Sequence, residues 1–590
     1  MTTGSLAKVA TVLLLAGVFA GPVWAQSEQP LRLVPGGQSQ TGQETPGSDA
    51  GTEAEDAGEP GIMIQDLGAV DPDSVGTIDA ASGGLGLDMW ANTPRSYIET
   101  LMRDFPSRIG SPAMRDLARR LLLSSAAIPQ PEGAGPSESL IGLRVRTLMR
   151  MGLLDDAQAL IAVAPRREED TALLKAQVEA QLLEFDLAGA CATAQSQAER
   201  LSEPFWQEIL VFCQIIEGDV SGAQFAADLL SETNPDPDPV FYTLLDHLAG
   251  DPSAAVSSLN EPRPLQLAMM RTARLELPPD VLNNETPALL RTVGVSPNAP
   301  LALRLEAAEA AAQAGAITPS LLAEVYDSVP FLPTELDSPI SAAEEEPGPR
   351  SRALLYRAAA VQDEAGALAA LLERAFQLAR QNKLYPLMIQ VHQPNLARIE
   401  PTPDLWWFAV EAARAHYALG EPDRARLWIE MLRGEASKDP DAQRAADSLW
   451  ALGRMTGEPE SNETDAEAAW QTAMRAADAQ GANFRISLAY VIFEALGEPV
   501  SQATWRELTR PDTFADTPVP DVALRRAMFA AAANGSRGET VLLALLTMGE
   551  HGPAATDPAV LSDLMVALVG VGLQADARAL AMEAMIEAGL

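Results

Sequence analysis

The sequence has little of what builds a disulfide framework or a metal site, because its 590 residues include only two cysteines and four histidines. Two cysteines exclude a disulfide-dense scaffold, and the small number of both residue types leaves little material for zinc or iron–sulfur centres. Beyond the N-terminal region, no stretch reaches the roughly 20 apolar residues that a helix needs to cross a membrane. We therefore expect no metal, no cofactor and no membrane span in the mature protein.

Positive charge is also scarce. The chain carries 42 basic and 81 acidic side chains, a net charge of −39. A nucleic-acid binder needs Lys and Arg to neutralise phosphates, and broad contact with an anionic membrane surface has the same requirement. The charge balance therefore disfavours both kinds of partner.

Residues 1–25 predict a signal peptide. Lys8 precedes an apolar run over residues 9–20, and Val23-Trp24-Ala25 has the pattern of a cleavage site. Cleavage there would leave a mature protein that begins at Gln26, and an uncleaved anchor is the alternative. We expect the mature protein in an oxidising compartment, the bacterial periplasm.

The composition then changes along the chain. Residues 26–60 are acidic and poor in aromatic and β-branched residues, which predicts a disordered linker. Residues 61–94 predict an irregular but ordered segment. Apolar residues then recur every three or four positions, so the expected fold class is all-α. A stretch rich in Pro and acids, 331–350, predicts a linker between an N-terminal helical array (95–330) and a C-terminal array (351–590).

An internal repeat runs through the N-terminal array. Its marker is a short turn that is followed by an alanine. The turn glycines are Gly152, Gly218 and Gly250, and the alanines are Ala157, Ala190, Ala223 and Ala255, at intervals of 33, 33 and 32 residues. A glycine ends the first helix of a hairpin in a left-handed conformation, and a small alanine early in the second helix lets the two helices approach closely. The repeat therefore predicts successive helical hairpins.

This pattern resembles the tetratricopeptide-repeat (TPR) superfamily of helical hairpins, whose period is similar. The same spacing recurs at Gly420 and Ala425, and at Gly572 and Ala577. Phe185 replaces the turn glycine of the second unit, and the aromatic positions typical of the family are mostly missing. The repeats are therefore degenerate, and the family's peptide-binding residues cannot be carried over by position. The resemblance implies a right-handed α-solenoid that works by binding, without naming the ligand.

The repeat register brings the two cysteines together. Cys191 falls early in the second helix of one unit, and Cys213 falls in the first helix of the next unit. Stacked hairpins place these two helices side by side, so we predict a disulfide between them. The alternative is that both cysteines are small buried hydrophobic residues.

Charge is unevenly distributed near the start of the mature chain. Residues 26–94 hold twelve acids and one arginine, whereas residues 95–150 hold nine arginines and five acids. One hypothesis is that the basic helices receive an acidic partner, with which the acidic linker competes. The alternative is that the arginines lie on solvated faces and pair locally. The candidate partner-binding residues are Arg103, Arg115, Arg119 and Arg120.

A second candidate surface is aromatic. Trp406, Trp407, Phe408, Tyr417 and Trp428 gather in one hairpin of a chain that is otherwise poor in aromatic residues. Trp406 and Trp407 point to different helix faces, so we expect one in the core and the other exposed. Core packing is one interpretation, and a stacking platform for a sugar or a peptide is the other.

The search for catalytic and metal-binding motifs finds little. The histidines are scattered, and neither a Gly-x-Ser-x-Gly elbow nor a Gly-x4-Gly-Lys phosphate loop occurs. Asp71, Asp73 and Asp79 match part of a calcium loop, but Val75 and Ser82 occupy two ligand positions, so a capped turn that bears acids is the alternative.

These observations predict an exported, non-enzymatic scaffold or adaptor that binds another protein of the cell envelope. The alternative is a glycan-binding accessory subunit of a cell-wall or exopolysaccharide system, and a stand-alone enzyme is a third possibility.

Overall fold

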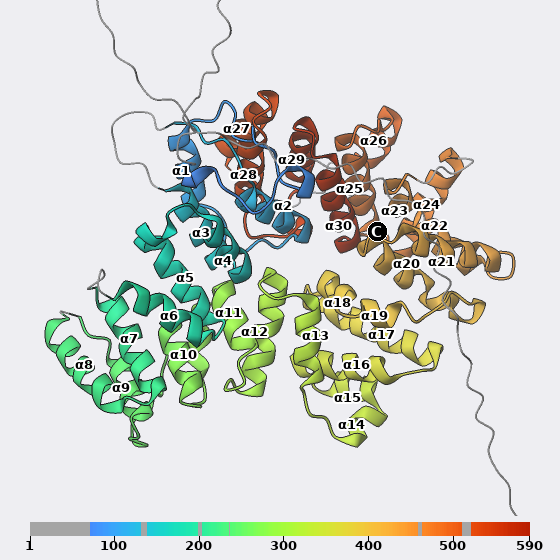
Figure 1. Cartoon of the computed structure of the whole chain (residues 1–590). Coiled ribbons are helices and arrows are strands. Elements are labelled where there is room, and N and C mark those ends of the chain that lie inside the picture. The colour runs from blue at the N-terminus through green and yellow to red at the C-terminus, as the bar shows by residue number, and fades with distance from the viewer. Residues whose placement is uncertain (1–70, 131–138, 199–202, 235, 458–462, 510–520) are drawn as a thin grey trace, which may run out of the picture. The chain divides into compact units, whose positions relative to one another are not determined.

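The structure is a computed structural model that describes residues 71–130, 139–198, 203–234, 236–457, 463–509 and 521–590. Within these ranges the chain is helical and contains no β-strand, and one isolated bridge joins Ile78 to Ser124 (Figure 1). The expected all-α fold class is confirmed for this part of the chain. The predicted signal peptide and acidic linker, residues 1–60, lie outside the described residues.

The first half of the described chain begins with an irregular segment that holds two short 3-10 helices, and longer α-helices follow it. Its elements are η1 (Pro72–Ser74), η2 (Ala80–Ser82), α1 (Arg95–Arg103), α2 (Pro112–Leu123), α3 (Leu140–Arg150), α4 (Leu154–Val163), η3 (Arg167–Glu169), α5 (Thr171–Leu183), α6 (Leu187–Gln197), α7 (Pro204–Glu217), α8 (Val220–Thr233), α9 (Pro239–Leu248), α10 (Pro264–Thr272), η4 (Pro279–Leu282), α11 (Pro287–Gly294), α12 (Leu301–Ala314) and α13 (Pro319–Asp327).

The second half continues in the same style. Its elements are α14 (Pro333–Asp337), α15 (Pro339–Glu345), α16 (Pro349–Val361), α17 (Ala365–Gln381), α18 (Tyr385–Val391), α19 (Gln393–Leu396), η5 (Pro403–Phe408), α20 (Ala409–Ala418), α21 (Pro422–Glu435), α22 (Pro440–Ser448), α23 (Trp450–Met455), α24 (Glu463–Ala477), α25 (Ala482–Ala495), α26 (Gln502–Leu508), α27 (Val522–Ala533), α28 (Arg537–Met548), η6 (Pro553–Ala555), α29 (Pro558–Gly570) and α30 (Gln574–Glu587).

Proline starts many of these helices. Pro112 is the first residue of α2, where a missing N–H costs nothing, and the Ser111 hydroxyl accepts a hydrogen bond from the Met114 N–H at 3.2 Å. The same sequence pattern at Thr93-Pro94 predicts that Thr93 caps α1, and this prediction is wrong. The Thr93 hydroxyl instead donates to Glu539 of α28 at 2.8 Å, so a long-range contact takes the group that a local cap would need.

Consecutive helices pair across short turns, for example α3 with α4, α5 with α6, α7 with α8, α20 with α21 and α29 with α30. The predicted turn glycines Gly152, Gly218, Gly250, Gly420 and Gly572 have φ angles of 74°, 91°, 111°, 70° and 82°. Phe185 adopts the same left-handed conformation at φ 63°. Glycine reaches this region without the steric penalty that a side chain brings. The pairing is compatible with a helical-repeat fold.

The alanines that follow these turns are buried between paired helices, with one exception. Ala157, Ala190, Ala223, Ala425 and Ala577 have no solvent exposure. The prediction for the fourth alanine of the series, Ala255, is wrong, because this residue is exposed and residues 251–263 form no helix. Asp280 accepts hydrogen bonds from the Ser258 hydroxyl and the Leu259 N–H, which satisfies polar groups of this segment without a second helix.

The expected linker over residues 331–350 contains two short helices, α14 and α15. Pro333 and Pro339 are their first residues, so the prolines that suggested a loop start helices instead. The Glu335 carboxylate accepts from the Leu332 N–H at 2.7 Å and pairs with Arg350 at the start of α16. α15 in turn packs on α16.

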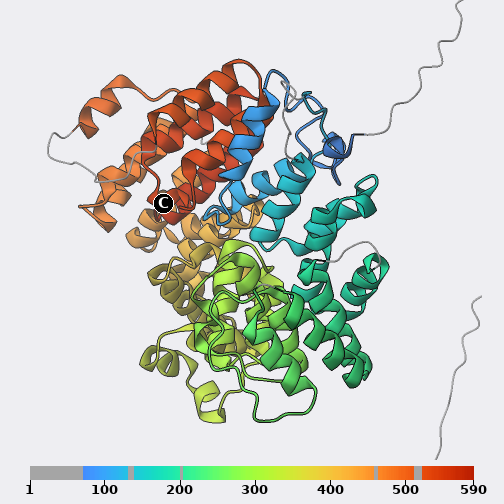
Figure 2. The same cartoon turned by 90° about the vertical axis from the view of Figure 1, so that its left-hand side faces the viewer.

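Helices from the two halves of the chain pack against each other, a point that the sequence left open. α1 and α2 contact α28, and α2 also contacts α30; Figure 2 shows the blue and the red helices side by side. The Gly538 N–H donates to the Met89 carbonyl at 2.7 Å, and a Cβ atom on Gly538 would lie 2.9 Å from that oxygen. A Cβ atom on Gly110 would lie 2.5 Å from the Gly552 nitrogen. Both close approaches therefore require glycine.

The core is apolar, and its largest fully buried side chains include Trp206, Trp428 and Trp470. In the part of the chain that the structure describes, no helix combines the length and the apolar character needed to span a bilayer.

Candidate functional site

An apolar cleft of about 370 Å³ lies where the start of α2 meets α18, α20, α23 and α30. We call it the Glu583 cleft. Its apolar lining includes Pro112, Pro386, Ala418, Met455, Met582 and Ile586. Its polar lining includes Gln390, Thr456 and Arg578. Clefts of this size with mostly apolar walls and a few polar groups are typical of binding sites.

One carboxyl group faces this cleft from α30. Glu583 Oε2 accepts hydrogen bonds from the Ser111 hydroxyl at 2.8 Å and from the Ala113 N–H at 3.2 Å. Glu583 Oε1 is buried and has no hydrogen-bond partner among the described residues. The capping serine of α2 therefore holds one oxygen of Glu583, and the other oxygen is buried without a hydrogen-bond partner in the described part of the chain.

The surroundings of Glu583 favour its protonated form. Burial, and next the negative charge of Glu587, raise the pKa of Glu583 to about 8, while the hydrogen bonds from Ser111 and Ala113 and the charge of Arg115 act in the opposite direction. At neutral pH the group is therefore mostly a neutral carboxylic acid, which donates one hydrogen bond. Its donor and the apolar walls together suit a short peptide segment, whose side chain the walls can bury while the acid meets a backbone carbonyl.

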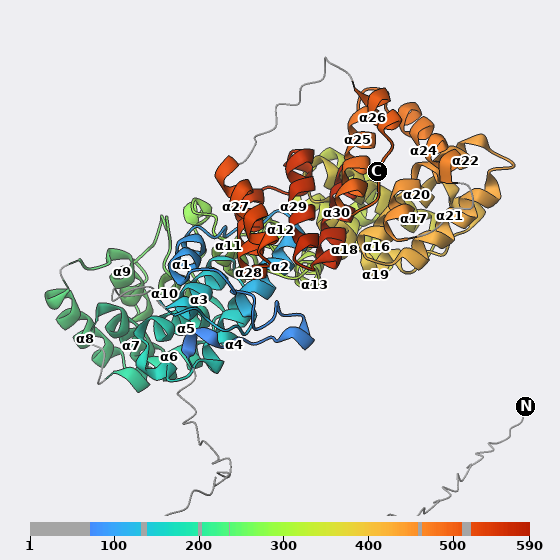
Figure 3. The ribbon, with the colours of Figure 1, turned by 90° about the horizontal axis from the view of Figure 1, so that it is seen from above.

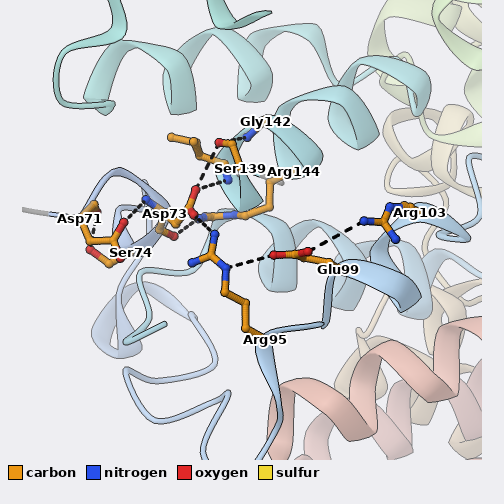
Figure 4. A network of polar contacts seen from close by, with 10 residues as sticks. Asp71, Asp73, Ser74, Arg95, Glu99, Arg103, Ser139, Gly142 and Arg144 are labelled. Atoms are coloured by element: carbon orange, nitrogen blue, oxygen red, sulfur yellow. Dashed lines mark hydrogen bonds and ion pairs between the residues drawn. The ribbon is translucent and has the colours of Figure 1, made fainter. Parts of the chain in front are cut away.

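A second feature, a buried polar network, fastens the irregular segment to α1 and α3 (Figure 4). The Asp73 carboxylate pairs with Arg95 at 2.5 Å and accepts from the Ile141 N–H at 2.9 Å, and Arg95 also pairs with Glu99 at 3.0 Å. Arg144 is buried and donates to the backbone carbonyl of Val75 in the irregular segment and to those of Leu122 and Ser124 at the end of α2. Burial lowers the pKa of Arg144 to about 10. Removing one member of such a buried pair leaves an uncompensated charge, so this network has a structural role.

The same network bears on the predicted calcium loop. Asp71 and Asp79 accept hydrogen bonds from backbone N–H groups of their own turns, whereas Asp73 is paired with Arg95. This arrangement corresponds to the capped turn that bears acids. No group of three metal-ligating side chains gathers anywhere in the described ranges.

Contacts within the chain occupy most of the arginines predicted to bind a partner. Arg119 makes a bidentate ion pair with Asp156 at 2.6 and 2.7 Å, and Arg120 pairs with Asp576 of α30 at 2.5 Å. Arg115 donates to the backbone carbonyls of Ile109 and Gln313. Arg103 is half-exposed and lies 3.9 Å from Glu99. Local pairing therefore describes this region better than an open basic face.

The aromatic cluster is mainly core. Phe408, Tyr417 and Trp428 are buried, and the rings of Phe408 and Trp428 meet edge to face. Trp406 is half-buried and packs against the core, whereas Trp407 is 41% exposed. Both tryptophans lie in η5, the 3-10 turn before α20. The split between a packed and an exposed tryptophan matches the expectation from the sequence.

The structure joins Cys191 of α6 to Cys213 of α7 in a disulfide, with Cα atoms 5.7 Å apart. These helices belong to successive hairpins and pack together. The bond therefore connects neighbouring units, as the repeat register predicted.

Sequence reasoning missed the Glu583 cleft. No local motif marks Glu583, and its partner Ser111 lies 472 positions away.

Comparison with known proteins gives no assignment. The chain matches no protein-family model, no curated protein and no solved structure. The functional argument therefore depends on the chain's own residues.

Proposed function

We propose that the protein is an exported, TPR-like α-solenoid scaffold that binds a segment of another cell-envelope protein in the Glu583 cleft. The observation that carries the proposal is the cleft itself, which combines apolar walls with a protonated acid whose Oε1 has no partner in the described part of the chain. Helices that succeed one another as hairpins support the scaffold class.

Two further features support the envelope as its location. Residues 1–25 have the pattern of a signal peptide, and the cysteines Cys191 and Cys213 are paired. Disulfides persist in oxidising compartments such as the periplasm. A partner would therefore be met after export.

Binding in the cleft would follow from two kinds of contact. The side chains of Met455, Met582 and Ile586 would pack on an apolar side chain of the partner, since Met adapts to irregular shapes. The neutral acid of Glu583 would donate to a backbone carbonyl, which fixes the direction of the segment. Ionisation of Glu583 removes this donor, so binding would weaken as the pH rises above about 8.

Affinity purification from crosslinked envelopes tests the proposal. The Met582→Asp variant places a charge in the cleft and should lose the protein that co-purifies with the native chain. The matched control, Phe225→Asp, makes the same kind of change at a side chain that is 72% exposed on α8. Recovery of the same partner with both variants would place the binding surface elsewhere, and circular dichroism checks that both variants fold.

The exposed indole of Trp407 favours one alternative, a glycan-binding accessory subunit. A half-exposed tryptophan face can stack on a sugar ring. Addition of cell-wall fragments would then shift the tryptophan fluorescence of the native chain and leave that of a Trp407→Ala variant unchanged.

A further inference from the structure

Helix α8 lies at an edge of the helical array, as Figures 1 and 3 show. In the two preceding hairpins the second helix packs on the helix that follows it: α4 packs on α5, and α6 packs on α7. The second helix of the third hairpin, α8, packs mainly on α7, while the next helix, α9, packs on α7 and α10. α8 therefore lacks the following helix that covers its two counterparts.

Two large apolar side chains point outward from α8. Phe225 is 72% exposed and Leu229 is 55% exposed, and they are neighbours on the helix surface because they lie one turn apart. The corresponding exposed residues of the preceding hairpins are Ala159 and Val163 in α4, and Ala192 and Ser196 in α6. Among these three helices, only α8 has a large apolar side chain at one position and a second, Leu or Phe, one turn away. The terminal helix of a repeat array normally has a polar outer face, so this pair favours a docking surface.

Negative charge surrounds the apolar pair. Residues 201–262 hold eleven acids and neither lysine nor arginine. Cations from outside this stretch pair with three of these acids, which are Glu203, Glu208 and Asp238. Four others lie at the start of α8 or along it, are exposed, and form no ion pair in the described part of the chain: Glu217, Asp219, Asp228 and Glu232. Their negative charge is therefore not neutralised within the chain.

The acids and the apolar pair share one side of the helix. Asp228 follows Phe225 by three positions, and Glu232 follows Leu229 by three, so each acid lies beside an apolar side chain. We call these four residues the α8 face. A helix with apolar residues at successive turns and with Lys or Arg beside them would match both features of this face. A second copy of the chain would bring the same acids against it, and like charges repel.

We propose that the α8 face binds a basic amphipathic helix of a partner protein. The apolar stripe of that helix packs on Phe225 and Leu229, and its basic residues pair with Asp228 and Glu232. The face is separate from the Glu583 cleft, which the start of α2 forms with α18, α20, α23 and α30. Each proposal can therefore fail without the other, and a change at Phe225 leaves the partner segment in the Glu583 cleft bound.

Fluorescence anisotropy with the full mature chain tests this proposal. The probe is a fluorescein-labelled peptide of three repeats of Leu-Lys-Ala-Ala-Leu-Lys-Lys, which places its leucines on one side of a helix. A chain with a net charge of −39 attracts any basic peptide, so the control peptide has the same composition in scrambled order. We expect saturable binding at about 0.15 M salt, with a Kd at least tenfold lower than that of the scrambled peptide.

Variants of the chain separate the α8 face from general attraction. Phe225→Ala should raise Kd about tenfold, because it removes an aromatic side chain at the centre of the contact. Its matched control is Val361→Ala, at a side chain of α16 that is 74% exposed, and this variant should change Kd less than twofold. Both changes are at exposed positions, so both variants should fold, which circular dichroism checks.

A second pair of variants tests the charges. The double variant Asp228→Asn with Glu232→Gln should raise Kd about fivefold and make it less dependent on salt. The control removes two exposed acids elsewhere, by Glu345→Gln with Glu346→Gln, and should keep the native Kd within twofold.

Three results would overturn the proposal. One is the same Kd for the native chain and Phe225→Ala, and another is an equal loss in each variant and its control. The third is a dimer of the native chain in analytical ultracentrifugation that Phe225→Ala converts to a monomer, because the occupant of the α8 face would then be a second copy.

Discussion

Glu583 makes stability depend on pH in a direction opposite to that of an ordinary paired carboxylate. In the folded chain its pKa is about 8, whereas an unperturbed Glu has a pKa of 4.5. Between these two values the unfolded chain has released the proton and the folded chain still holds it. The free energy of unfolding therefore falls as the pH rises through this window and is fully reduced above about pH 8.

The magnitude follows from the width of the window. Each pH unit costs about 1.4 kcal/mol, so the full window of about three and a half units corresponds to about 5 kcal/mol. Glu583→Gln replaces the protonated acid with a neutral group of the same shape that still accepts from Ser111 and Ala113. We expect the variant to match the native chain at pH 5 and to be several kcal/mol more stable at pH 8.

Urea unfolding followed by circular dichroism between pH 5 and pH 8 measures this difference. Other groups, including Glu587, whose pKa burial also raises, contribute to the pH dependence of both proteins, so the comparison is between the two curves. Glu232→Gln, at an exposed position of α8, should follow the native curve. A Glu583→Gln curve parallel to the native one across the whole range would refute the reasoning about the cleft.

Three other predictions concern the repeat architecture. Cys213→Ser opens a disulfide whose cysteines are 22 positions apart and should destabilise the chain by about 3 kcal/mol, and reductant should then have no further effect on urea unfolding. Gly218→Ala should lower the free energy of unfolding by about 1 kcal/mol, because only the positive φ at this position opposes a side chain. Gly152→Ala should lower it more, because the new Cβ atom would also lie 2.6 Å from the Cβ atom of Ala316. Thermal unfolding of both variants measures the difference. Ala157→Leu should cost about 1–3 kcal/mol by overpacking, and Ala255→Leu, at an exposed position, should stay within about 0.5 kcal/mol of the native chain in the same assay.

Short sequence patterns at helix starts and turns predicted much of the fold. The start of α2 at Ser111-Pro112 and the left-handed turns at Gly218 and Gly420 depend on residues within one helical turn, so the pattern contains what is needed. The prediction that Ala255 lies in the second helix of a hairpin was wrong, because this segment makes tertiary hydrogen bonds to Asp280 where a helix was expected. The prediction that Thr93 caps α1 was wrong for the same reason, because the Thr93 hydroxyl donates to the distant Glu539.

The Glu583 cleft was hidden because its residues come from distant parts of the chain. Glu583 depends on the start of α2, which lies near the other end of the sequence. Composition along the chain pointed instead to residues 95–150, where the pairs of Arg119 with Asp156 and of Arg120 with Asp576 use the charge internally. The spacing of apolar residues along a helix predicts which face of that helix is buried, but it does not predict which other helices pack against that face.

Photo-crosslinking in living cells tests the central claim most directly. A photoreactive amino acid at Met582, inside the Glu583 cleft, should capture one protein of the cell envelope, and the adduct should be sensitive to protease and resistant to glycan hydrolases. The same amino acid at Phe225, on the exposed face of α8, should not capture that protein. Absence of any protein adduct at Met582, or the same adducts at both positions, would contradict the account.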